Sequence, residues 1–204
     1  MPRGNVDFEG LDSPDAKAIK AMEPPPAMPF TISRIGHVVL KVADIERSVE
    51  FYTQVLGFKV TDVYPESMMK GRMVFLRFSP DHHGVALVGK DDAGASTHSE
   101  MHHMAFQVET LDEVFRARDH LESKGVPIDY EGRRRAGCQV AVEFRDPDGH
   151  NLEIYWGLDQ VPLDADARPP EEWIATPSLE EAVAKAPPGQ DTTLADPSLM
   201  RTAN

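Results

Sequence analysis

The chain of 204 residues has little cysteine, little basic charge and no long apolar run. Its single cysteine, Cys138, excludes an intrachain disulfide and a Cys-x-x-Cys zinc or redox motif. The formal net charge is −13, and no segment of the chain is basic. Both facts argue against nucleic-acid and anionic-membrane partners. No run approaches the roughly 18 apolar residues of a membrane span, and the N-terminus has no apolar signal core. We therefore expect a cytoplasmic protein.

Proline is scarce in the middle of the chain and frequent at both ends. Of the 17 prolines, six lie before residue 31, seven lie after residue 160 and four lie between. Polar, proline-rich segments without a period do not hold regular structure. We therefore expect a domain at 31–160 between an N-terminal arm at 1–30 and an acidic extension at 161–204. Apolar residues predict that the extension is partly ordered near 171–185, against the domain or a neighbouring subunit.

The middle of the chain contains an internal repeat. Counted from His37, a predicted helix opens at +8 and a helix-ending glycine lies at +20; counted from His103, the same features lie at +8 and +22. One predicted strand precedes each helix and three follow it, so the sequence predicts two tandem βαβββ modules at about 33–90 and 100–158. We expect an α+β fold in which the two sheets, each with one apolar face, curl around a shared cavity.

Three side chains are expected to point into this cavity. His37 and His103 occupy equivalent positions of the repeat. On the last predicted strand Glu153 alternates with Leu152 and Ile154, so it projects from the face opposite the apolar one. A carboxylate buried without a partner is costly, and a divalent metal removes that cost. Two imidazoles and one carboxylate with open positions suit Fe(II), with Mn(II) or another divalent metal as the alternative.

Several other polar residues have plainer interpretations. His102 precedes a candidate ligand and is expected to point to the outer face, by strand alternation. His82 and His83 lie in a predicted turn and are expected to be solvated. The arginine run at 133–135 could meet an anionic substrate at the cavity mouth, although a charged run in a loop is more often a solvated surface.

The segment 33–156 resembles the vicinal oxygen chelate superfamily, which contains glyoxalase, bleomycin- and fosfomycin-resistance proteins and the type I extradiol dioxygenases. The resemblance rests on four segments that include the runs Gly-His-Val-Val-Leu-Lys-Val, Leu-Gly-Phe, His-His-Met-Ala-Phe and Asp-Pro-Asp-Gly-His, at 36–42, 52–58, 102–108 and 146–155. It implies the two-module fold and a metal held by the two histidines and the glutamate named above. The superfamily uses one scaffold for isomerisation, thiol addition and oxygenation, so the reaction is less specified than the fold.

One position favours the dioxygenase branch of this family. Aligning the modules on Pro80 and Pro147 places Ala86 opposite Glu153. The glyoxalase-type isomerases generally take a fourth ligand, a carboxylate, from about this place, and alanine cannot coordinate. Three ligands leave open positions for a small aromatic vicinal diol and for O2. The resemblance also implies a homo-oligomer, since dimers are common in similar proteins.

The chain departs from the extradiol pattern at the residues that handle protons. Glu143 stands where those enzymes have a tyrosine ten residues before the metal glutamate, and Val88 and Gly89 stand near their cavity histidine. The candidates to replace them as catalytic residues are His98 and Tyr155. Alternatively, His98 is an exposed histidine of the linker. Tyr155 lies on the inward face of the last strand, and the alternative for it is that it only lines the cavity.

Two other functions stay open from the sequence. One is a metal-dependent isomerase, epimerase or lyase of the glyoxalase type. The other is a non-catalytic, resistance-type module that sequesters an aromatic ligand. Bound metal would distinguish either enzyme from the non-catalytic module. Oxygen uptake would distinguish the dioxygenase from the glyoxalase-type enzyme.

Overall fold

The computed structural model describes residues 6–23, 35, 37–89, 101–162 and 165–201. Its strands are β1 (Val38–Val42), β2 (Lys59–Tyr64), β3 (Met73–Arg77), β4 (Val85–Gly89), β5 (Met104–Gln107), β6 (Ile128–Arg133), β7 (Val140–Arg145) and β8 (Asn151–Trp156). The α-helices are α1 (Phe8–Leu11), α2 (Pro14–Lys20), α3 (Ile45–Gln54), α4 (Leu111–Ser123) and α5 (Leu179–Ala184). Single 3-10 turns lie at Pro170–Glu172 and Pro197–Leu199.

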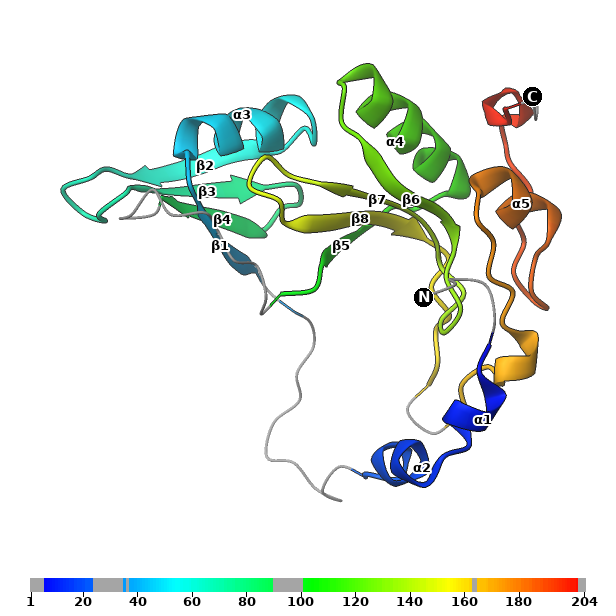
Figure 1. The fold of residues 1–204 in the computed structure, drawn as a ribbon. Helices are drawn as coiled ribbons and strands as arrows, with labels where there is room; N and C mark the ends of the chain where they lie inside the picture. Colours follow the sequence, from blue (N-terminus) through cyan, green and yellow to red (C-terminus); the bar gives the residue numbers. More distant parts are fainter. Residues whose placement is uncertain (1–5, 24–34, 36, 90–100, 163–164, 202–204) are drawn as a thin grey trace.

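The strands form two four-stranded sheets of the same topology (Figure 1). The order is β1-β4-β3-β2 in the first sheet and β5-β8-β7-β6 in the second. In each sheet the first and last strands of the module run parallel, and the remaining pairs are antiparallel. The expected α+β fold of two tandem βαβββ modules is confirmed.

The two module helices begin and end on local sequence signals. The Asp44 side chain caps α3 by accepting a first-turn backbone N–H at 3.0 Å. Thr110 and Glu113 form a capping box at the start of α4. Gly57 and Gly125 follow the two helices with φ of 71° each, in the left-handed region that glycine adopts without strain.

Both helices cover the same side of the sheets, and none of the described helices packs on the other face of either sheet, which we call the open face (Figure 1). On that open face of the first sheet, Val39 is 47% exposed. The two sheets are not closed into a barrel. The metal-centred cavity expected between them therefore stays a prediction. Among the helices that the structure describes, none is long and apolar enough to cross a membrane.

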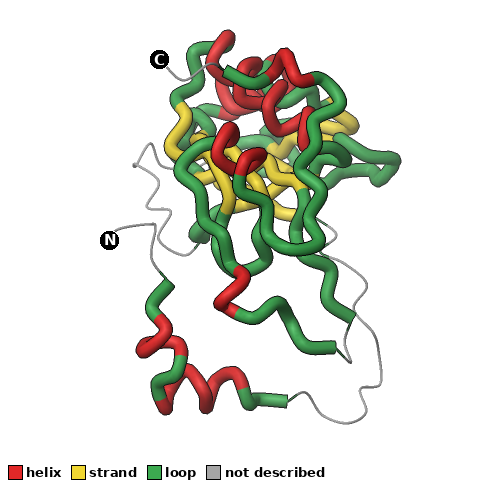
Figure 2. The backbone as a smooth tube through the Cα atoms, turned by 90° about the vertical axis from the view of Figure 1, so that its right-hand side faces the viewer, coloured by secondary structure: helices red, strands yellow, loops and turns green. Residues whose placement is uncertain are grey.

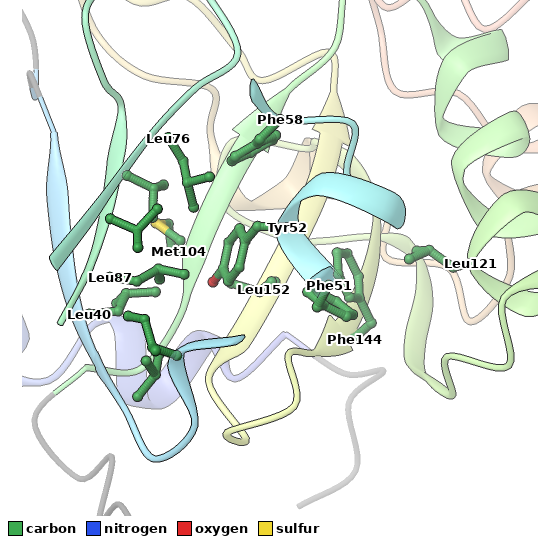
Figure 3. Close-up of a cluster of buried hydrophobic side chains, with 14 residues drawn as sticks. Leu40, Phe51, Tyr52, Phe58, Leu76, Leu87, Met104, Leu121, Phe144 and Leu152 are labelled. Atoms are coloured by element: carbon green, nitrogen blue, oxygen red, sulfur yellow. The ribbon is translucent and has the colours of Figure 1, made fainter. Parts of the chain in front are cut away.

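One apolar cluster joins the two modules beneath α3 (Figure 3). Phe51 and Tyr52 of α3 pack in a single buried cluster with Met104, Phe144 and Leu152 of the second module. Removing such a side chain from water contributes about 1.5–3 kcal/mol per residue. The two modules are therefore joined by a shared buried cluster.

A buried turn of the second module binds the helix of the first. Asp148 accepts hydrogen bonds from the Ala43 backbone N–H at 2.6 Å and the Ser48 hydroxyl at 2.7 Å. Asp146 accepts one from the Tyr52 hydroxyl at 3.2 Å. Burial acts to raise the pKa of the Asp148 carboxyl, but these donors outweigh it and the pKa lies below its ordinary value. Asp148 therefore stays ionised at neutral pH and fixes the start of α3.

The N-terminal segment lies away from the sheets. The two short helices α1 and α2 stand at the foot of the molecule (Figure 2), and neither buries a residue. Phe8 and Ile19 are among their exposed apolar side chains.

The C-terminal segment covers the outer edge of the second sheet. Arg133, at the end of β6, is wholly buried and donates to the backbone carbonyls of Ala182 and Lys185. Arg118 of α4 is also wholly buried and donates to Glu180 at 2.8 Å. The expectation of a solvated arginine run was wrong at Arg133, because the segment folds back over β6 and supplies the acceptors.

We predict that Asp148→Ala lowers the free energy of unfolding by about 1–3 kcal/mol, because it leaves the buried Ser48 hydroxyl without its acceptor and removes the bond to the exposed Ala43 N–H. Urea denaturation followed by circular dichroism measures the loss. Asp129→Ala serves as the control: it removes an exposed ion pair with Arg145 and should change stability by less than about 0.5 kcal/mol. Equal effects of the two substitutions would contradict the role of the turn.

Candidate metal centre

Glu153 is a buried carboxylate on the open face of the second sheet. Strand pairing places it between Ala105 of β5 and Glu143 of β7. The residue is only 2% exposed, and none of the described donors reaches its Oε1 atom. A desolvated carboxylate oxygen without a donor is destabilising. The position therefore favours a cation as its partner, which was the expectation from strand alternation.

His103 lies beside this carboxylate. Its Nε2 atom is 3.7 Å from Glu153 Oε2, and its Nδ1 atom is 2.8 Å from Nδ1 of His102. If His103 donates its Nδ1 proton to His102, the His103 Nε2 lone pair faces the glutamate, which is the tautomer that a metal ligand needs. The outer-face position expected for His102 stays a prediction, and the contact of its ring with His103 was not expected. Both histidines precede the first residue of β5, so strand alternation does not govern them.

His37 occupies the equivalent place in the first sheet. It precedes β1 by one residue and is exposed, and its ring lies against His83, with ring centroids 4.6 Å apart. His83 is half-buried rather than solvated. Burial, and next the rings of His37 and His82, hold the pKa of His83 below its ordinary value. The neutral imidazole is therefore favoured at neutral pH.

The structure brings together two of the three predicted ligands. His103 and Glu153 meet on the second sheet, whereas His37 lies with His83 on the first. Within the part of the chain that the structure describes, no three histidine, cysteine, aspartate or glutamate side chains come close enough to hold a metal ion. One chain thus presents two half-sites on two open faces.

Ala86 takes the position in the first sheet that Glu153 takes in the second. Val39 pairs with Ala86 in parallel register, as Ala105 pairs with Glu153. The alanine is wholly buried and offers no ligand. At this position only the second module has a carboxylate, as the alignment of the repeat indicated.

The two catalytic candidates have different outcomes. Tyr155 lies on β8, two residues beyond Glu153 and half-buried. Burial, and next the Glu153 carboxylate, raises the pKa of the Tyr155 hydroxyl, so the group is a proton donor at neutral pH. His98 lies outside the described residues.

The contacts of Glu143 next to Glu153 were not predicted from the sequence. Glu143 is directly opposite Glu153 on β7, and Glu143 forms an ion pair with Arg134. The guanidinium of Arg134 lies 3.8 Å from the ring centroid of Tyr130. Like charges opposite each other repel, and Arg134 offsets one of the two. The alternation of β7 carried the signal, since Glu143 interrupts a run of apolar residues.

Comparison with known proteins identifies the fold family. Residues 34–154, more than half of the chain, match the family model described as the Glyoxalase/Bleomycin resistance protein/Dioxygenase superfamily. The 3-methylcatechol 2,3-dioxygenase of Pseudomonas putida is 29% identical over 130 residues, which cover 62% of this chain and 43% of that protein. The probable lactoylglutathione lyase of Vibrio cholerae serotype O1 is 25% identical over 122 residues, which cover 59% of this chain and 88% of that protein.

A solved structure agrees with these matches. The trypanothione-dependent glyoxalase I of Leishmania major is 29% identical with a TM-score of 0.50, over 62% of this chain and 88% of that one. The match spans less than half the length of the dioxygenase relative. The chain belongs to the glyoxalase, bleomycin resistance protein and dioxygenase superfamily.

Proposed function

We propose that the protein is a non-haem Fe(II)-dependent, extradiol-type dioxygenase that cleaves a catechol-like aromatic ring with O2. His37, His103 and Glu153 are its metal ligands in this proposal, and Mn(II) is the alternative metal. The observation that carries it is the buried Glu153 carboxylate, whose Oε1 atom lacks a described donor and whose Oε2 atom faces His103. Two neutral imidazoles and a carboxylate match the ligand preference of Fe(II).

The neighbouring residues support the same chemistry. When bound, Fe(II) supplies a Lewis acid that polarises the oxygens of the substrate. His102 holds the tautomer of His103, and Arg134 holds Glu143 away from competing as a ligand. Tyr155 offers a hydroxyl donor on the same face as Glu153.

Ala86 favours the dioxygenase over the isomerase alternative. It leaves the first sheet without a carboxylate at the position equivalent to Glu153. Fewer protein ligands leave more positions for exogenous ones, and a dioxygenase needs room for both oxygens of the diol and for O2. The similarity to a 3-methylcatechol 2,3-dioxygenase supports this choice. The similarity to a probable lactoylglutathione lyase supports the isomerase alternative.

We also propose that the working unit is a homodimer in the cytoplasm. His37 and the pair His103 and Glu153 lie on different open faces of one chain, and no described third ligand completes either half-site. A second copy that pairs its first sheet with this second sheet would complete two identical centres by symmetry. Alternatively, the two sheets of one chain move closer together and bring His37 to His103 and Glu153.

The metal centre predicts a specific loss of iron in ligand variants. Anaerobically purified wild-type protein should retain about one equivalent of Fe(II), whereas His103→Ala and Glu153→Ala should retain less than about a tenth, because each removes a donor. Inductively coupled plasma measurements give the occupancy, and circular dichroism checks the fold. His120→Ala, which changes a histidine outside both half-sites, is the matched control. A Glu153→Ala protein at full iron occupancy would rule out this ligand set.

The reaction predicts oxygen uptake by the iron-loaded protein. Addition of an aromatic diol from a panel of catechols should consume O2 in equimolar amount and produce the yellow ring-cleavage product, followed with an oxygen electrode and by absorbance. Absorbance changes of the diol without any O2 uptake would contradict the dioxygenase proposal. Turnover of a thiol adduct of a 2-oxoaldehyde by the same protein would support the glyoxalase-type enzyme instead.

The homodimer predicts complementation between two inactive variants. His37→Ala and Glu153→Ala chains, co-refolded in equal amounts, should recover about one quarter of the wild-type iron, because half of the dimers are mixed and each mixed dimer has one intact centre. Each variant alone should bind none. Analytical ultracentrifugation confirms the dimer. Absence of recovery in a mixed dimer would show that all three ligands come from one chain.

A further inference from the structure

A second group of polar side chains lies on the open face of the first sheet. Strand register places Val39, Ala86, Phe75 and Asp62 in one row across its four strands. His83, from the turn before β4, lies over this row, with its ring centroid 5.0 Å from that of Phe75. This group is separate from the pair on the second sheet and extends from the sheet edge to His37.

The polar side chains form a continuous chain of contacts. Asp62 Oδ2 lies 2.8 Å from His82 Nε2, and His82 Nδ1 lies 3.0 Å from His83 Nδ1. The His83 ring then lies against His37, with ring centroids 4.6 Å apart and an interplanar angle of 49°. The chain therefore connects an exposed carboxylate to a candidate metal ligand.

The donors and acceptors of neutral imidazoles beside a carboxylate determine where the protons lie along these contacts. A carboxylate only accepts, so His82 carries its proton on Nε2. The Nδ1 atom of a neutral His82 is then an acceptor, and the proton shared with His83 comes from His83 Nδ1. His83 is left with an unprotonated Nε2 atom. This is the less common tautomer of a free imidazole side chain, so it depends on Asp62.

We propose that Nε2 of His83 accepts a hydrogen bond from a hydroxyl group of the substrate, and that Asp62 and His82 are positioning residues that hold it in the accepting tautomer. The class of substrate, an aromatic diol, rests on the proposed function. His83 lies beside His37, so the acceptor is close to the place where a diol would meet the metal. A site that must pair with a hydroxyl binds the corresponding ether or unsubstituted ring poorly.

The tautomer is tested first in the metal-free protein. Long-range nitrogen-15 and proton correlation spectra of the full chain at pH about 8, where imidazoles are ordinarily neutral, report which nitrogen carries the proton. The wild type should show His83 with a protonated Nδ1 and an unprotonated Nε2, assigned by loss of the signals in His83→Leu. Asp62→Asn should shift His83 toward the opposite tautomer, and Asp62→Glu should restore it. Asp129→Asn, which removes an exposed carboxylate of the second module, should change nothing.

Binding is tested second, with nitrocatechol titrated by absorbance into the iron-loaded protein under anaerobic conditions. His83→Leu should raise the dissociation constant about three- to tenfold, the loss of one hydrogen bond. His83→Gln, whose amide oxygen can accept, should recover part of the affinity. Iron content should equal that of the wild type, which separates an effect on the substrate from an effect on His37.

The outcomes separate this inference from the proposed function. His83 protonated at Nε2 in the wild type, or wild-type nitrocatechol affinity in His83→Leu, overturns the inference. Nitrocatechol binding that depends on His83 without any O2 uptake overturns the dioxygenase and leaves the acceptor role intact. Failure of the wild type to bind nitrocatechol at all overturns both the substrate class and the role of His83 in binding it.

Discussion

The arrangement of the two modules depends on one buried turn of carboxylates. Asp146 accepts hydrogen bonds from the His150 backbone at 2.9 Å and from the His150 ring at 2.7 Å, while it also holds Tyr52 of the other module. Burial and the Asp146 carboxylate raise the pKa of Tyr52 well above its ordinary value, so the hydroxyl stays a donor. Together with the bonds of Asp148 to Ala43 and Ser48, these contacts hold α3 of the first module against the turn of the second.

Local patterns in the sequence predict most of the fold and half of the candidate site. The caps of α3 and α4, their terminal glycines and the succession of strands and helix along each module depend on neighbouring residues, so they can be predicted from the sequence. The inward face of Glu153 follows from alternation along β8, and the absence of a carboxylate at Ala86 follows from the repeat. These features need no knowledge of distant contacts.

The contacts that sequence reasoning missed join residues outside regular strands or far apart in the chain. His102 meets His103 because both lie just before β5, where alternation does not apply. Arg133 is buried because a segment about fifty residues later supplies its acceptors. His83 is half-buried because its turn folds onto Phe75. Periodicity carries no information on any of these, since each depends on how a loop or an extension returns to the sheet.

The covered edge of the second sheet also limits how copies of the chain can add to one another. A bridge between Arg133 and Thr176 occupies β6, whereas β2 is hydrogen-bonded to β3 alone among the described strands, and five of its six residues are exposed. Head-to-tail addition of β2 to β6 would repeat without end and give a filament. The C-terminal segment blocks that polymer at β6. Pairing of β2 with β2 of a second copy about a twofold axis would instead stop at two copies.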